Sequence, residues 1–188
     1  VVSSALDFIL PFEKYKIMAG AKVSFTNTRN GINYDTSDPT LVQDDYFRYK
    51  EQIYALYADY SREFSERFSM QLGLRMEHTR TTGISEAKDT EDKHDYTRLF
   101  PTVYLLYSPT DGHALNFSFS NRISRPSQNM VNPFPFYQNK YTYACGREDL
   151  KPSYTYNAEL GYTLKNNFNV SAYYSYSDDV FFQVVDLD

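Results

Sequence analysis

The large apolar residues of this chain recur at every second position over most of its length. Between residues 68 and 77, one set of alternate positions is apolar throughout: Phe68, Met70, Leu72, Leu74 and Met76. The intervening positions hold Ser, Gln, Gly, Arg and Glu. An α-helix would mix the two sets, because its equivalent positions recur at intervals of three and four. The pattern predicts a β-strand with one apolar face and one polar face.

The same alternation returns in four other segments, at residues 15–26, 115–124, 156–164 and 168–176. Residues 51–61 and 97–108 also favour strands, although they carry apolar residues on both faces. With a short first strand near residues 2–10, the chain has about eight strands. The clean runs of about 10 to 14 residues exceed the ~5–6 typical of soluble sheets and suffice for the ~9–11 that cross a bilayer at a tilt.

The connections between these strands alternate between short and long. Short links are expected at residues 11–14, 61–66, 109–112 and 165–167, and long ones at 27–47, 80–95 and 125–153. The sequence therefore predicts an all-β fold: an antiparallel up-and-down meander of about eight strands with every long loop at one end. Outer-membrane β-barrels have this asymmetry, with short periplasmic turns and long extracellular loops.

The alternation does not by itself say which way the apolar face points. In a soluble sandwich or a lipocalin-like barrel the apolar face is the core, whereas in an outer-membrane barrel it meets lipid. Charged residues at the centres of the polar face favour lipid outside and a wet interior: Lys22, Arg75, Glu77, Arg122 and Glu159. Aromatic residues near the strand ends are typical of interfacial girdles, although the chain has no Trp.

Composition narrows the range of functions. The formal net charge is -5 and the chain has no run of Lys and Arg, so nucleic acid is not expected as a partner. One cysteine allows no internal disulfide, and the three histidines lack ligand spacing, so we expect no metal and no cofactor. The acidic residues at 89–95 could bind Ca²⁺, but they lack the spacing of a calcium loop, which favours a solvated loop. No Gly-x-Ser-x-Gly motif is present, and we expect no catalytic residues and no enzyme activity.

The long segment after residue 125 is rich in aromatic residues and prolines. Its candidate ligand-binding residues are Phe134, Phe136, Tyr137, Tyr141 and Tyr143. These rings could form a platform that stacks on a nutrient such as a sugar. Alternatively, they pack the loop onto itself and onto the rim of the barrel. The sequence favours the second interpretation, because aromatic residues bury large areas wherever a loop folds back.

A series of short motifs appears in a recurring order. They are Phe47-x-Tyr49-x-Glu51-x-Ile53, Leu72-Gly73-Leu74-Arg75-x-Glu77-x-Thr79, Leu99-Phe100-Pro101-Thr102, Asn121-Arg122-Ile123-Ser124-Arg125-Pro126, Asn132-Pro133-Phe134, Gly146-x-x-x-Leu150-Lys151-Pro152 and Glu159-Leu160-Gly161-Tyr162. The order and spacing of these motifs resemble the barrel region of TonB-dependent outer-membrane receptors, and especially the outer-membrane β-barrel family common in Bacteroidetes.

The resemblance implies a barrel of about twenty-two strands, of which residues 1–188 would be a single segment without the plug domain. It implies a Gram-negative outer-membrane location and contact with outer-membrane lipid. It also implies a large nutrient ligand and energy from the TonB complex acting on the absent plug. The alternative function is a soluble or surface β-domain that binds a ligand through its long loops. An excised sheet has open edges, so self-association is also expected.

Overall fold

A computed structural model describes residues 1–33, 44–85, 90–139, 142–147, 149–165 and 167–185, without the side chains of 32–33, 44–45 and 90. The chain is almost entirely β-structure with one short helix. The elements are β1 (Val2–Pro11), β2 (Tyr15–Asn33), β3 (Asp44–Ser65), β4 (Phe68–Ser85), β5 (Thr90–Tyr107), β6 (His113–Ser124), α1 (Gln128–Val131), β7 (Phe136–Asn139), β8 (Thr142–Ala144), β9 (Ser153–Leu164) and β10 (Phe168–Asp178). No helix in the described part has the length and apolar character needed to cross a membrane.

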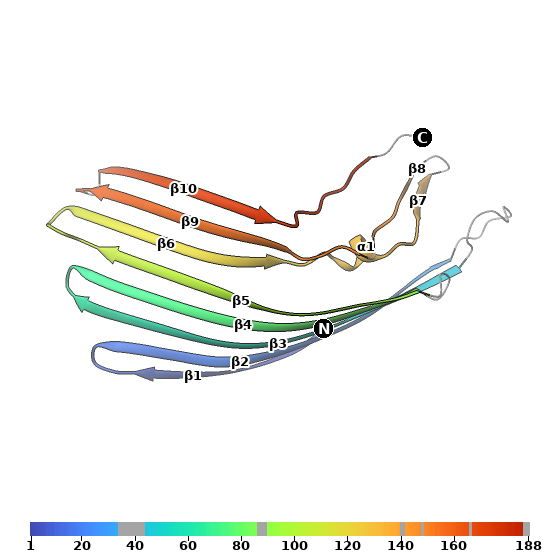
Figure 1. Ribbon diagram of the computed structural model, residues 1–188, viewed down its shortest axis with the longest axis horizontal. Helices are drawn as coiled ribbons and strands as arrows, with labels where there is room; N and C mark the ends of the chain where they lie inside the picture. Colours follow the sequence, from blue (N-terminus) through green and yellow to red (C-terminus); the bar gives the residue numbers. More distant parts are fainter. Residues whose placement is uncertain (34–43, 86–89, 140–141, 148, 166, 186–188) are drawn as a thin grey trace.

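Eight of the strands form one sheet in the order β1-β2-β3-β4-β5-β6-β9-β10 (Figure 1). Each strand pairs antiparallel with the next, and the β7–β8 hairpin belongs to the connection between β6 and β9. This is the predicted eight-stranded up-and-down meander, and the prediction is confirmed. The sheet does not close on itself among the described residues, because β1 and β10 each have a single neighbour.

The predicted alternation of short and long connections is confirmed in part: the four short links are present, but only four residues separate β4 from β5, where a long loop was expected. Residues 12–14, 66–67 and 108–112, with the link from β9 to β10, turn the chain at one end of the sheet, on the left of Figure 1. In the third turn, Gly112 adopts a φ of 79°, a left-handed conformation that glycine adopts without a steric penalty. β2 and β3, β4 and β5, and β6 and β9 are joined at the opposite end, and the longest of these connections is the one from β6 to β9.

The strands extend further than predicted at this second end. β2 and β3 remain paired as far as Asn33 and Asp44, and β4 and β5 as far as Ser85 and Thr90. The predicted loops at 27–47 and 80–95 are therefore wrong over most of their length. The apolar and polar residues stop alternating there because the outward face has left the apolar band and the inward face carries buried side chains of both kinds, such as Phe47 and Ser85, while the backbone ladder continues.

The register shows that the apolar face is the exposed one. Leu74 of β4 is directly opposite Ala58 of β3 and Pro101 of β5, and half of its surface is accessible (50%). Leu56, Leu99 and Leu160 on the same face are 56%, 54% and 54% exposed. On the other face Glu77 and Thr79 are buried, at 7% and 0%. The prediction of an outward apolar face and an inward polar face is confirmed.

The height of the apolar face fits a bilayer. On β4 the outward residues are apolar from Phe68 to Met76, and His78 is the first polar one. At a rise of about 3.3 Å per residue and a tilt of about 40°, the stretch from Phe68 to Met76 covers about 20 Å along the membrane normal. That height accounts for most of the apolar band of about 25 Å on outer-membrane barrels.

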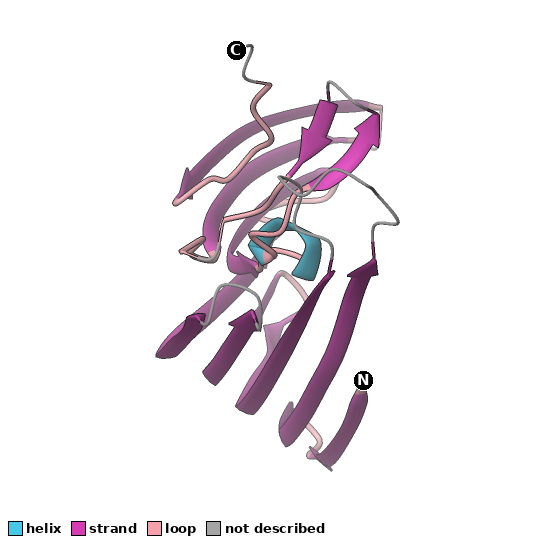
Figure 2. Ribbon diagram, turned by 90° about the vertical axis from the view of Figure 1, so that its right-hand side faces the viewer, coloured by secondary structure: helices cyan, strands magenta, loops and turns pink. Residues whose placement is uncertain are grey.

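The sheet divides into two parts beyond its middle. β5 pairs with β4 over its whole length, but with β6 only from Thr102 to Tyr107. The pairing with β6 stops at Pro101, which has no backbone N–H to donate. Above this point β6, β9 and β10 curve away from β1–β5, as Figure 2 shows, and the sheet becomes a trough. We call the line where β5 and β6 separate the seam.

Inward side chains connect strands that are not neighbours. The Tyr57 hydroxyl of β3 donates a hydrogen bond to Asp7 of β1 and crosses β2 at Gly20. A Cβ atom at Gly20 would lie 2.6 Å from the Tyr57 ring, so glycine is needed for this crossing. Contacts between polar and aromatic side chains on the inward face thus link strands that share no backbone pairing.

An arginine introduced on the outward face of β4 should destabilise the protein far more than one introduced on the inward face. In the full-length protein, Leu74→Arg should lower the free energy of unfolding from lipid vesicles by about 2–4 kcal/mol, because Leu74 lies near mid-height of the apolar band. The matched control Gln71→Arg places the same side chain on the inward face of the same strand and should cost little. Denaturant titration in vesicles measures both, and equal losses would contradict the assignment of the faces.

Candidate functional site

The connection from Arg125 to Pro152, called here the inner loop, lies over the concave face of the sheet (Figure 2). It contains α1 and the β7–β8 hairpin. Val131 and Phe134 are buried within it, at 8% and 4% exposure. The inner loop is therefore a folded unit that occupies the polar side of the trough.

The base of the inner loop is held by backbone pairing. The N–H of Gly146 donates to the carbonyl of Asn132, and the N–H of Arg147 donates to the carbonyl of Met130, both at 2.7 Å. The Asn132 side chain accepts a hydrogen bond from the N–H of Phe134 at 3.1 Å. A Cβ atom at Gly146 would lie 2.7 Å from the Asn132 carbonyl oxygen and closer still to that of Met130. Only glycine allows the two segments to approach this closely.

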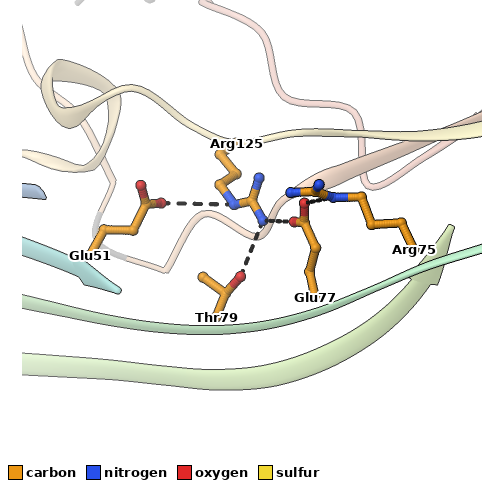
Figure 3. Close-up of polar contacts among 5 residues, drawn as sticks. All are labelled: Glu51, Arg75, Glu77, Thr79 and Arg125. Atoms are coloured by element: carbon orange, nitrogen blue, oxygen red, sulfur yellow. Dashed lines mark hydrogen bonds and ion pairs between the residues drawn. The ribbon is translucent and has the colours of Figure 1, made fainter. Parts of the chain in front are cut away.

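Arg125 attaches the inner loop to the wall (Figure 3). Its Nη2 atom donates to Glu77 Oε2 at 2.5 Å and to Thr79 Oγ1 at 3.1 Å. Its Nε atom lies 3.8 Å from Glu51 Oε2, an ion pair without a direct hydrogen bond. Arg125 follows directly after β6, whereas its partners are on β3 and β4. The side chain thus reaches across the seam.

The charges around Arg125 are balanced. Glu77 also accepts a hydrogen bond from Arg75 Nε at 2.5 Å, so the cluster holds two guanidinium groups and two carboxylates with Glu51. Burial alone would lower the pKa of Arg125, but the hydrogen bonds and the negative charge of Glu77 outweigh it and raise the pKa. Arg125 is therefore charged at every physiological pH, and the cluster works as a fixed ionic fastener.

A second contact crosses the seam nearby. The guanidinium of Arg98 on β5 lies over the ring of Tyr154 on β9, with 4.9 Å between its central carbon and the ring centroid. Such cation–π contacts are worth about 0.5–1 kcal/mol at exposed sites. This contact and those of Arg125 hold the two parts of the sheet together where β5 and β6 are not paired.

A small cavity lies between the inner loop and the wall. It is lined by residues that include Tyr49, Glu51, Tyr96, Arg125 and Leu150. Its volume of about 40 Å³ corresponds to roughly three water molecules at about 10–15 Å³ each. The cavity is too small for a nutrient, so we do not assign it as the ligand site.

The candidate ligand-binding aromatics are divided by the structure. Phe134 is buried within the inner loop, whereas Phe136 and Tyr143 on the hairpin are 56% and 55% exposed. Tyr137 packs against Tyr143, with ring centroids 5.5 Å apart. Tyr141 lies outside the described residues. The burial of Phe134 therefore agrees with the interpretation that these rings pack the loop onto itself. A role in ligand binding stays a prediction for the rings of the hairpin.

The titratable residues considered for metal binding do not converge. His78 contacts Thr97 and Asp95, His94 contacts Asp92, and His113 contacts Tyr162. Within the described ranges, no three His, Cys, Asp or Glu side chains are placed to hold a metal ion. The acidic residues from 91 to 95 belong to β5 and are not in a loop.

The role of Arg125 was not predicted from the sequence. The sequence places Arg125 in a motif and Glu77 on the polar face, but no local pattern connects the two residues. The available signal was a cation directly after a strand, followed by Pro126, at the start of the longest connection. Only the pairing of β3 with β4 brings both carboxylates to one place.

The Arg125 fastener predicts a specific loss in a variant. Arg125→Ala leaves the buried Glu77 carboxylate with a single cationic partner and should cost about 3 kcal/mol of attachment energy. Amide hydrogen exchange in the inner loop should then accelerate roughly a hundredfold. Arg147→Ala is the matched control, because its exposed ion pair with Asp149 lies on the same loop away from the wall. Unchanged exchange in Arg125→Ala would rule out the fastener.

The close approach at Gly146 gives an independent test. Gly146→Ala should separate residues 130–132 from residues 146–147, and their amides should lose protection from exchange while the strands keep theirs. Retention of full protection would show that the backbone shifts to accept the methyl group.

Comparison with known proteins supports this architecture. The sequence matches the outer membrane protein beta-barrel family over residues 1–188. The fold is similar to the ferric yersiniabactin uptake receptor FyuA from Yersinia pestis, with a TM-score of 0.60, 15% identity and coverage of 95% of this chain and 28% of that one. It is also similar to the unliganded ferric citrate transporter FecA, with a TM-score of 0.53, 14% identity and coverage of 88% and 24%. No curated protein sequence matches the chain.

At these identities the two receptors share the fold, and this chain spans about a quarter of their length. The family match covers every residue, and the outward apolar stretch of β4 accounts for most of the apolar band of such barrels. The predicted outer-membrane location is therefore confirmed, and this chain belongs to the outer membrane protein β-barrel family.

Proposed function

We propose that this chain forms part of the barrel wall of a TonB-dependent transporter that carries a large nutrient across the outer membrane. The observation that supports the proposal most directly is the inward-folded loop, which covers part of the polar side of the trough and is fastened to it through Arg125. A barrel that only spans the membrane, without guiding a ligand through its interior, needs no such loop. A transporter needs a lumen whose contents are held in defined positions.

The similarity to an uptake receptor and a transporter gives a second argument. Both neighbours act on iron chelates according to their descriptions, and this chain is proposed to act on a ligand of comparable size. In this scheme the energy comes from the TonB complex through a plug domain encoded elsewhere in the same protein. Catalysis has no part in it, and we propose that the protein is not an enzyme.

The exposed rings of the β7–β8 hairpin are the proposed point of ligand contact. Phe136 and Tyr143 stand at the long-loop end of the sheet, where a ligand from outside the cell would arrive. Base, sugar or chelate rings stack on such aromatics without specific hydrogen bonds. The alternative is a surface β-domain that binds a ligand through the same rings. It differs from the transporter in that the bound ligand is not carried across the membrane.

Two results separate the transporter from a binding domain. The reading frame that encodes this chain should also encode a plug domain and further strands of the same alternating pattern. A reading frame that encodes neither a plug domain nor further strands would contradict the transporter proposal and favour the binding domain.

Uptake provides the functional test. A deletion strain should fail to grow on at least one nutrient of a panel of ferric chelates and oligosaccharides, and an uncoupler or loss of TonB should reproduce the defect. Phe136→Ala with Tyr143→Ala in the full-length protein should reduce uptake of that nutrient about tenfold or more. Tyr174→Ala, an exposed ring on the outward face of β10, is the control and should not. Growth of the deletion strain on every nutrient would overturn the proposal.

A further inference from the structure

Three cations lie together on the outward face of the sheet, just above the apolar band. They are Arg29 on β2, with Arg48 and Lys50 on β3. We call them the basic patch. Arg29 and Lys50 are exposed and Arg48 is half-buried. The chain as a whole carries a formal charge of -5, so the patch does not follow from its composition.

The register places like charges against each other. Arg29 is directly opposite Arg48, and Lys50 is two positions from Arg48 on the same face. Like charges directly opposite in an antiparallel pair are destabilising. Neither arginine nor Lys50 forms an ion pair within the part of the chain that the structure describes. The Nε atom of Arg48 is also buried without a hydrogen-bond partner among the described residues.

The next two strands provide a contrast at the same height. Arg80 on β4 pairs with Asp95 at 2.8 Å, and Lys93 on β5 pairs with Glu91 at 2.8 Å. Cations there have carboxylate partners from the chain itself. Among the described residues at this height of β2 to β5, the cations without an ion-pair partner are therefore those of β2 and β3.

The patch lies at the level of lipid headgroups. Phe25 is the last apolar outward residue of β2, and its partner on β3 is Gln52. Lys50 and Arg48 follow two and four residues further along β3. At about 3.3 Å per residue and a tilt of about 40°, they stand about 5 and 10 Å beyond the hydrocarbon edge. The long connections place this end of the barrel on the extracellular side.

We propose that the basic patch binds the phosphate groups of the anionic glycolipid in the outer leaflet of the outer membrane. Its charge complements a phosphate, and an arginine pair can hold phosphate oxygens in a bidentate manner. A phosphate between Arg29 and Arg48 turns the repulsion of the two guanidinium groups into a shared contact. The inference needs only the membrane location and is independent of nutrient transport.

The test uses the full-length protein in detergent, titrated with bisphosphorylated lipid A and followed by native mass spectrometry. The matched arms are lipid A stripped of its phosphates and inorganic phosphate alone. The wild-type protein should prefer the bisphosphorylated lipid at least tenfold over the stripped lipid and bind inorganic phosphate weakly. Each cation near the surface contributes roughly fivefold, so Arg29→Gln with Lys50→Gln should weaken binding about twenty-five-fold.

The control is Lys16→Gln with Lys22→Gln, which removes the same charge from the inward face of β2 and should leave lipid binding unchanged. Arg29→Lys with Lys50→Arg keeps the charge and should retain most of the binding, which separates the patch from a folding defect. Equal affinity for the two lipids, or equal losses in the test and control pairs, would overturn the proposal. Tight binding of inorganic phosphate would show a soluble anion as the occupant and overturn it as well.

Discussion

The lack of water inside a bilayer is the constraint on which this structure depends. A backbone N–H or C=O facing hydrocarbon cannot hydrogen-bond to solvent, so each must find a partner within the protein. Long antiparallel strands provide these partners and leave the side chains free to divide between two environments. In this chain the division is complete on β4, where Leu74 meets lipid and Glu77 is buried on the opposite face.

The seam between β5 and β6 is the one place in the described sheet where neighbouring strands part well before their ends. Pro101 explains why the ladder stops there, and the side chains explain how the two parts stay together. Arg125 reaches from the end of β6 to carboxylates of β3 and β4, and Arg98 lies over Tyr154. Longer-range side-chain contacts thus replace the missing backbone bonds.

The strands and their two faces could be predicted from the sequence, because period-two alternation is a local property. The ends of β2 to β5 could not be predicted, because alternation disappears where the outward face has left the apolar band and the inward face buries polar and apolar residues alike, while pairing continues. The fastener was also beyond prediction: Arg125 is 48 residues from Glu77, and their meeting depends on strand register. The buried position of Phe134 likewise depends on how residues 130–132 meet 146–147.

The balance of charge around Arg125 also bears on the surroundings of an outer-membrane protein. Ionic strength outside a cell varies widely, and exposed ion pairs weaken as dissolved ions screen them. Glu77 and Thr79 are shielded from the medium, and the four charged groups sum to zero. Mobile ions therefore screen these contacts less than they screen exposed ion pairs. The position of the inner loop is thereby less sensitive to the salinity of the habitat than a surface ion pair would make it.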